Sequence, residues 1–65
     1  MPFVRIDMFE GRTKEQKAAL ARAVTAAVQE TLGAPPEHIY VVINELPPEN
    51  VAIGGVPRSK DAGHK

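Results

Sequence analysis

Pro2 is the residue of this chain best suited to chemistry on a small molecule. It follows Met1 directly, and aminopeptidases normally remove a methionine that precedes such a small residue. Its ring nitrogen would then be a free secondary amine, whose pKa falls towards neutrality when apolar groups or a cation lie beside it. Such an amine suits general acid-base catalysis. The alternative interpretation is structural, because proline is tolerated at the first position of an edge strand. If Met1 stays, the nitrogen is an inert amide.

Other side chains could complete a site around that amine. Arg12 could act as the nearby cation and could bind a substrate carboxylate through two parallel hydrogen bonds; otherwise it is a solvated loop residue or an ion-pair partner for Glu10. Tyr40 is either a pocket wall and hydrogen-bond donor or an aromatic residue packed between subunits. Together with Phe3 and Val51, Tyr40 could give the amine apolar surroundings.

The composition argues against several other functions. The 65 residues carry eight basic and eight acidic side chains with no basic block, so the electrostatic footprint of a nucleic-acid binder is missing. There is no cysteine, and His38 and His64 are far apart in the sequence, so we expect no metal site. No apolar run approaches the ~20 residues of a membrane span, and no signal peptide is recognisable. We therefore expect a cytoplasmic protein without membrane contact.

Two segments have the pattern of long β-strands. In residues 3–9, Val4, Ile6 and Met8 point to one face and alternate with the other residues. Residues 39–46 are largely apolar on both faces, which is typical of a strand covered on both sides. Residues 51–55 are predicted to form a short strand or hairpin arm that ends in a glycine pair, and residues 56–65 a polar tail.

A helix is predicted between the two long strands. Thr13 and Gln16 have capping-box spacing, residues 14–32 form an amphipathic run rich in alanine, and Gly33 suits the helix end. About thirty residues thus connect the strands, which is the length of a parallel, right-handed crossover. The predicted fold class is α/β: one β-α-β domain of residues 1–65 with a C-terminal β-hairpin.

Such a subunit is too small to bury both faces of its own sheet. One helix covers one face of a two-stranded sheet, and a two-stranded sheet is marginal alone, so we expect strands to pair between chains. Pro2 and Arg12 bracket a strand of about 20 Å, too long for one small substrate to touch both. If two first strands pair antiparallel, Pro2 of one chain lies near Arg12 of the other and the site is shared. Arg5 and Asp7 would make ion pairs between chains or line the oligomer centre.

The segments PFVRIDMFEGRTKEQKAALARAVTAAVQETLGAP and VVINELPPENVAIGG resemble the 4-oxalocrotonate tautomerase family. Pro2, EGRTKEQK after the first strand and the late IGG carry the resemblance. It implies a homohexamer, a trimer of dimers with shared sites. It also implies proton transfer without cofactor or metal in unsaturated 2-oxo acids and their enols, as in aromatic compound catabolism. Pro2 aligns with the family's general base and acid, Arg12 with its carboxylate-binding arginine, and Gly54 and Gly55 with turn glycines.

Two expected substrate-binding positions depart from the family pattern. Tyr40 stands where members acting on dicarboxylates have an arginine, and Val51 where they have a phenylalanine. Tyr40 donates a hydrogen bond but brings no fixed charge, so we expect a broader or different enol substrate rather than high activity on 4-oxalocrotonate. The alternative function is a catalytically weak or inactive scaffold, such as a partner subunit of a tautomerase-like hetero-oligomer.

Overall fold

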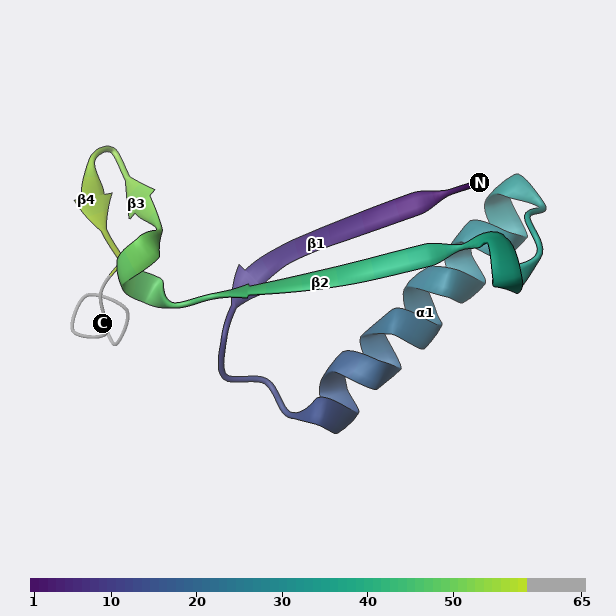
Figure 1. Ribbon diagram of the computed structural model, residues 1–65, viewed down its shortest axis with the longest axis horizontal. Coiled ribbons are helices and arrows are strands. Elements are labelled where there is room, and N and C mark those ends of the chain that lie inside the picture. The colour runs from purple at the N-terminus through teal and green to yellow at the C-terminus, as the bar shows by residue number, and fades with distance from the viewer. Residues whose placement is uncertain (59–65) are drawn as a thin grey trace.

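A computed structural model of the chain, which describes residues 1–58, contains one parallel strand pair, one long helix and a small hairpin (Figure 1). The elements follow in the order β1 (Phe3–Phe9), α1 (Lys14–Leu32), η1 (Pro36–His38), β2 (Tyr40–Leu46), η2 (Pro48–Asn50), β3 (Ala52–Ile53) and β4 (Val56–Pro57). The predicted α/β class, with its β-α-β order and C-terminal hairpin, is confirmed.

β1 and β2 pair in parallel, in a register that runs from Phe3 opposite Tyr40 to Phe9 opposite Leu46. Alternation along each strand sends every second side chain towards α1, which lies along one face of the pair (Figure 1). The apolar side chains on the helix-facing side are all half-buried: Val4, Ile6, Met8, Val41 and Ile43. The predicted division of β1 into an inner and an outer face is therefore confirmed.

Local signals define both ends of α1. The Gln16 backbone N–H donates to the Thr13 hydroxyl at 3.0 Å, and the Thr13 backbone N–H donates to the Gln16 side chain at 2.9 Å. This reciprocal capping box satisfies two donors at the helix start. At the other end Gly33 adopts a left-handed φ of 73°, a conformation that glycine reaches without steric cost. The predicted helix bounds are confirmed, and no helix in residues 1–58 has the apolar length needed to cross a bilayer.

The second face of the strand pair has no cover in the described chain. No hydrophobic side chain of residues 1–58 is fully buried, and the radius of gyration is 14.9 Å, whereas a compact chain of this length would have about 10–11 Å. The large side chains left exposed are Met1, Phe3, Phe9, Leu32, Tyr40, Val42, Ile53 and Val56. The subunit thus consists of one helix packed on one face of a two-stranded sheet, and residues 1–58 enclose no fully buried hydrophobic core.

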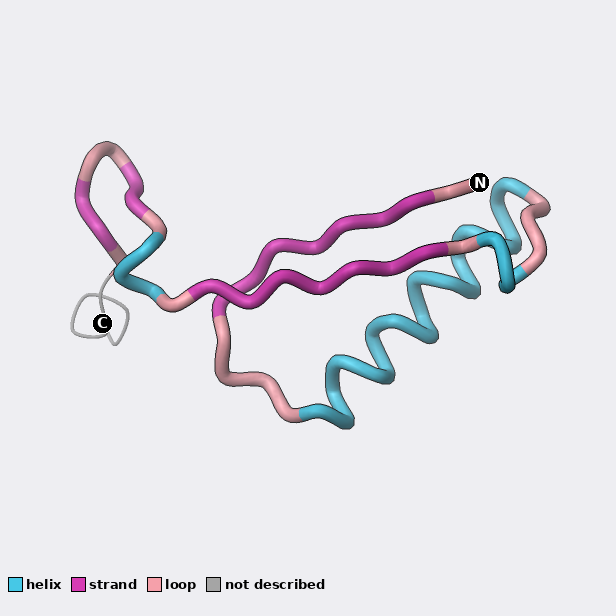
Figure 2. Tube along the Cα trace, in the orientation of Figure 1, coloured by secondary structure: helices cyan, strands magenta, loops and turns pink. Residues whose placement is uncertain are grey.

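The C-terminal hairpin differs from the sequence prediction in detail, and the short 3₁₀ turns η1 and η2 precede β2 and β3 (Figure 2). Gly54 and Gly55 form the turn with φ of 62° and 85°, values that a tight hairpin turn requires at both central positions. Its second arm, β4, takes the first two residues of the expected polar tail, because β3 pairs with it. The rest of that tail, residues 59–65, lies outside the described residues. β2 begins at Tyr40 rather than residue 39, since the Ile39 N–H closes η1.

We expect Thr13→Ala to lower the free energy of unfolding by about 1 kcal/mol, because it removes the hydroxyl that caps α1. Urea denaturation followed by circular dichroism, at one fixed protein concentration, measures the change. Thr31→Ala, at an exposed position of the same helix, is the matched control. Equal destabilisation by the two substitutions would contradict the role of the cap.

Candidate active site

Pro2 forms the first rung of the parallel strand pair through its carbonyl group. The Tyr40 backbone N–H donates to the Pro2 carbonyl oxygen at 3.0 Å. Because this hydrogen bond uses the Pro2 carbonyl, the strand pair loses no hydrogen bond through the absence of an N–H group on proline. Pro2 is half-buried, while Met1 is 81% exposed. The ring nitrogen is thus held at a fixed place without taking part in the strand ladder.

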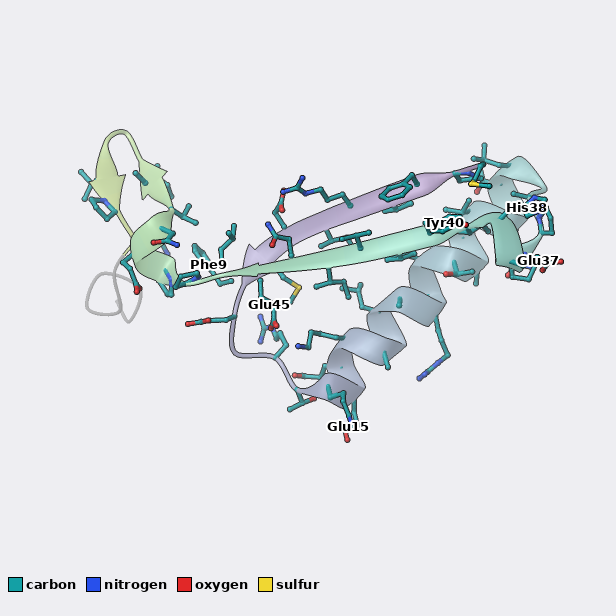
Figure 3. All side chains as sticks on the ribbon, in the orientation of Figure 1. Phe9, Glu15, Glu37, His38, Tyr40 and Glu45 are labelled. Carbon is teal, nitrogen blue, oxygen red and sulfur yellow. The ribbon has the colours of Figure 1, made fainter. Side chains whose placement is uncertain are left out.

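Phe3 follows Pro2 in the chain and its ring stacks on that of Tyr40, whose backbone bonds to Pro2. Their centroids are 5.6 Å apart and their planes differ by 3°, which is within the range of offset-stacked aromatic pairs. Both rings lie on the sheet face that α1 leaves uncovered, and Phe3 and Tyr40 are 67% and 46% exposed. Figure 3 shows Tyr40 at the start of β2, at the same end of the sheet as the N-terminus. The structure therefore brings Pro2, Phe3 and Tyr40 together.

Arg12 lies in the loop between β1 and α1. Figure 1 shows this loop at the end of β1 opposite the N-terminus. The Arg12 side chain is exposed, and it forms no ion pair within residues 1–58, so Glu10 is not its partner. It borders a hollow of about 190 Å³ whose other lining residues are Met8, Gln16, Lys17 and Leu20. An exposed guanidinium beside the first turn of a long helix is well placed to bind an anion, because the N-terminal end of a helix carries partial positive charge.

Lys17 and Glu45 connect this first helical turn to β2. The Lys17 Nζ lies 2.8 Å from the Glu45 Oε1, and both side chains are 30% exposed. Figure 3 shows Glu45 between β2 and α1. The sequence analysis did not predict this ion pair. The signal that could have indicated it is Glu45, a charged residue that follows Val41 and Ile43 on the helix-facing side of β2. The pair is one contact between the first turn of α1 and β2.

Val51 lies at the Arg12 end of the sheet and not beside Pro2 of its own chain. It borders a second hollow, of about 350 Å³, together with Asp7, Met8, Phe9, Leu46 and Ile53. β1 has seven residues, which at about 3.3 Å per residue separate its ends by roughly 20 Å. Within one chain the structure thus groups Pro2 with Tyr40 and keeps Arg12 and Val51 away from them. A site that contains all four remains a prediction about neighbouring copies.

A polar cluster lies on the uncovered face, half-way along the strands. The Asp7 Oδ1 accepts from the Arg5 Nε at 3.2 Å and from the Asn44 Nδ2 at 3.0 Å. The hydrogen bond from Asn44, followed by that from Arg5, lowers the pKa of the Asp7 carboxyl below its ordinary value. Arg5 is thus already paired within its own chain, and its pairing between chains remains a prediction. Nowhere in residues 1–58 do three potential metal ligands of the His, Cys, Asp or Glu type gather.

Several known proteins are similar to the chain over most of its length. The family model for tautomerase enzymes matches residues 2–60. A probable tautomerase of Bacillus cereus is 58% identical over 55 residues, which are 85% of this chain and 90% of the relative. YwhB, a homologue of 4-oxalocrotonate tautomerase, has 46% identity and a TM-score of 0.86 over 91% of this chain and 97% of its own. A heterohexameric 4-oxalocrotonate tautomerase from Chloroflexus aurantiacus has 41% identity and a TM-score of 0.83 over 89% and 94%.

A double-mutant cycle with Lys17→Ala and Glu45→Ala tests the connection between α1 and β2. We expect a coupling energy of about 0.5–1 kcal/mol in the free energy of unfolding, because both charges are partly exposed. The same cycle with Arg22→Ala and Glu30→Ala, at two exposed positions of α1 that form no ion pair with each other, should give a value near zero. Equal coupling in the two cycles would exclude a specific contribution of the Lys17–Glu45 pair.

Proposed function

The chain belongs to the tautomerase family, and from this we propose that it is a cofactor-independent tautomerase of unsaturated 2-oxo acids and their enols, with Pro2 as general base and acid. The single observation that carries the proposal is the setting of Pro2. Its carbonyl is fixed to β2 by the Tyr40 N–H, its ring nitrogen is free of the ladder, and the adjoining residues Phe3 and Tyr40 carry stacked aromatic rings.

Removal of Met1 would convert the Pro2 nitrogen from an amide into a secondary amine. Apolar neighbours disfavour the charged form of an amine and so lower its pKa, which leaves a larger neutral fraction to act as a base. The neutral amine takes the proton from the enol oxygen, the electron pair closes the carbonyl, and a carbon of the former enol takes the proton back. The reaction is an isomerisation, so no electrons are gained or lost.

Arg12 of a neighbouring copy is proposed to bind the substrate carboxylate, with Val51 and Tyr40 as further walls of a shared site. Self-association is supported by the uncovered sheet face and its exposed apolar side chains, and by the hexameric assembly of the relative from Chloroflexus aurantiacus. Antiparallel pairing of two β1 strands would bring Pro2 of one chain to the Arg12 end of the other. The proposed assembly is a homohexamer built from three such dimers.

The alternative is a subunit without its own turnover, which works as a partner in a hetero-oligomer. Two observations favour this alternative function: Tyr40 stands where a family arginine is expected, and one relative is a heterohexamer. The intact mass of the purified protein separates the two functions. Loss of Met1 supports the enzyme, and quantitative retention of Met1 supports the partner subunit.

Pro2→Ala is expected to lower the ketonisation rate of 2-hydroxymuconate or phenylenolpyruvate by at least about 100-fold, the usual contribution of a positioned acid-base group. Ultraviolet absorbance follows the reaction. Pro35→Ala, at an exposed proline before η1, is the control and should keep full activity. A Pro2→Ala protein as active as the wild type would refute the mechanism.

Arg12→Ala is expected to lower kcat/KM by about 10–100-fold, mainly through KM, because a charge-assisted hydrogen bond to the substrate carboxylate is lost. The matched control is Arg22→Ala, at an exposed position of α1, which should leave both constants unchanged. If Arg12→Ala changes neither kcat nor KM, the carboxylate is bound elsewhere.

A further inference from the structure

We propose that Arg5 and Asp7 set the alignment in which β1 pairs with β1 of a second copy, with Arg5 of each chain opposite Asp7 of the other. The inference rests on the antiparallel dimer of the proposed function and supplies what that dimer leaves open, the alignment of its two strands. It is carried by the direction of the backbone groups of β1, by the symmetry of such a pair and by the order of the charges along the strand.

β1 has an unpaired edge in the part of the chain that the structure describes. Its partner there is β2, in a sheet of two strands. The Pro2 carbonyl and the Glu10 N–H bond to β2, and the even-numbered residues between them face β2 as well, because successive residues point their backbone groups to opposite sides. Neither a proline nor a bulge interrupts β1, although these are common ways to block an edge. The residues whose N–H and C=O groups face the free edge are Phe3, Arg5, Asp7 and Phe9.

Symmetry restricts how two such edges can align. Two identical chains that pair in this way are related by a two-fold axis, so each contact between two different residues occurs twice. Directly opposite residues must both direct their hydrogen-bonding groups towards the partner strand, so odd-numbered residues face odd-numbered ones. The alignments that keep most of β1 paired therefore place Arg5 opposite Asp7, Arg5 opposite Arg5, or Asp7 opposite Asp7.

Charge distinguishes these alignments. Opposite charges that face each other across two strands stabilise the pair, and like charges destabilise it. Only the alignment of Arg5 with Asp7 avoids like charges, and it also pairs β1 over its full length. Both side chains retain capacity for the contact, since they are 64% and 51% exposed. Within residues 1–58 their hydrogen bonds use the Arg5 Nε and the Asp7 Oδ1, which leaves the other Arg5 nitrogens and the second Asp7 oxygen for a neighbour.

The same alignment brings the separated parts of the proposed site together. Continued past the strand, it places Pro2 of one copy opposite Glu10 of the other, about 5 Å away across the strands. Arg12 follows two residues after Glu10. Phe9, which borders the hollow beside Val51, comes opposite the neighbour of Pro2 in the second copy. The charges on one face of β1 would thus decide which groups meet at the proposed base.

The first test mixes two charge-reversal variants of the full chain, Asp7→Arg and Arg5→Asp. Alone, each variant places like charges opposite one another, and we expect its self-association to weaken by about tenfold or more. Mixed, the two variants place unlike charges opposite one another at both contacts, so the mixture should associate at least about tenfold more tightly than either variant. Sedimentation velocity measures the dissociation constants. Each variant has like charges within its own chain, so restored association cannot come from a pair inside one chain.

The control mixture is Arg22→Asp with Glu30→Arg, at exposed positions of α1. These variants have the same net charges as the first two, and their mixture should associate no more tightly than its components. An equal gain in the control mixture would mean that net charge, and not the proposed alignment, causes the association.

The second test is an engineered disulfide, because the chain has no cysteine. In the proposed alignment Ile6 faces Ile6 of the second copy in a pair without mutual hydrogen bonds, whose Cα atoms lie about 4.5 Å apart, within the range of a disulfide. We expect Ile6→Cys to give a covalent dimer on mild oxidation, seen by non-reducing electrophoresis. Ile43→Cys is the matched control, since Ile43 is the half-buried partner of Ile6 on β2, and it should form no covalent dimer.

Each contrary outcome identifies what fails. A charge-variant mixture that associates no more tightly than its components overturns the alignment, as does a disulfide through Ile43→Cys in place of Ile6→Cys. Where a charge variant does not fold alone, recovery of its helical circular dichroism on mixing is the expected result, and Ile6→Cys still decides. None of these measurements uses turnover. A protein that associates as proposed but converts neither 2-hydroxymuconate nor phenylenolpyruvate refutes the proposed function alone, and an active enzyme that fails both tests refutes the alignment alone.

Discussion

The parallel pairing of β1 with β2 decides where each candidate residue of the site lies. The register places Phe3 opposite Tyr40, and the hydrogen bond from the Tyr40 N–H extends the same ladder to the Pro2 carbonyl. A slip by one residue would turn Tyr40 towards α1 and separate the rings, because side chains alternate between the two faces. The pairing that gathers Pro2 and Tyr40 also sends Arg12 and Val51 to the far end of the strands.

A single helix covers a single face of this pair, and that constraint links the stability of the subunit to association. Burying one large apolar side chain contributes about 1.5–3 kcal/mol, whereas a whole domain is stable by only about 5–15 kcal/mol. Covering a few of the side chains that β1 and β2 leave exposed, such as Phe3, Tyr40 and Val42, would therefore contribute as much as the isolated subunit's own margin. Association through the proposed face would therefore stabilise the chain more than any single contact inside the subunit does.

The features that were predictable from the sequence are those that depend on neighbouring residues. The capping box at Thr13 and the left-handed Gly33 both act within one helical turn, so the bounds of α1 followed directly. The stack of Phe3 on Tyr40 and the ion pair of Lys17 with Glu45 depend on how distant segments align, and no local pattern contains that register. The hairpin was predicted, but its second arm, β4, lies in residues assigned to the polar tail, since two residues next to a polar segment carry too little pattern to indicate a strand.

The same distinction holds for the candidate site. Residue types were enough to propose Pro2 as a base and Arg12 as a cation, and both roles stay predictions, but only the structure showed that Val51 lies at the Arg12 end. Which site residues lie together depends on the length and direction of β1. These are set by its pairing with β2 and cannot be read from the composition.

The separation of Pro2 from Arg12 along β1 also has an electrostatic consequence. A base that must be neutral is favoured by apolar surroundings, while a carboxylate requires a cation, and β1 keeps these two environments at opposite ends of the subunit. Antiparallel association would bring an Arg12 guanidinium to the apolar end of the neighbouring chain. A nearby cation lowers the pKa of an amine, as burial does, so the contact that supplies the carboxylate site would also increase the neutral fraction of Pro2. Under this arrangement substrate binding and activation of the base depend on the same contact between chains, and an isolated subunit would lack both.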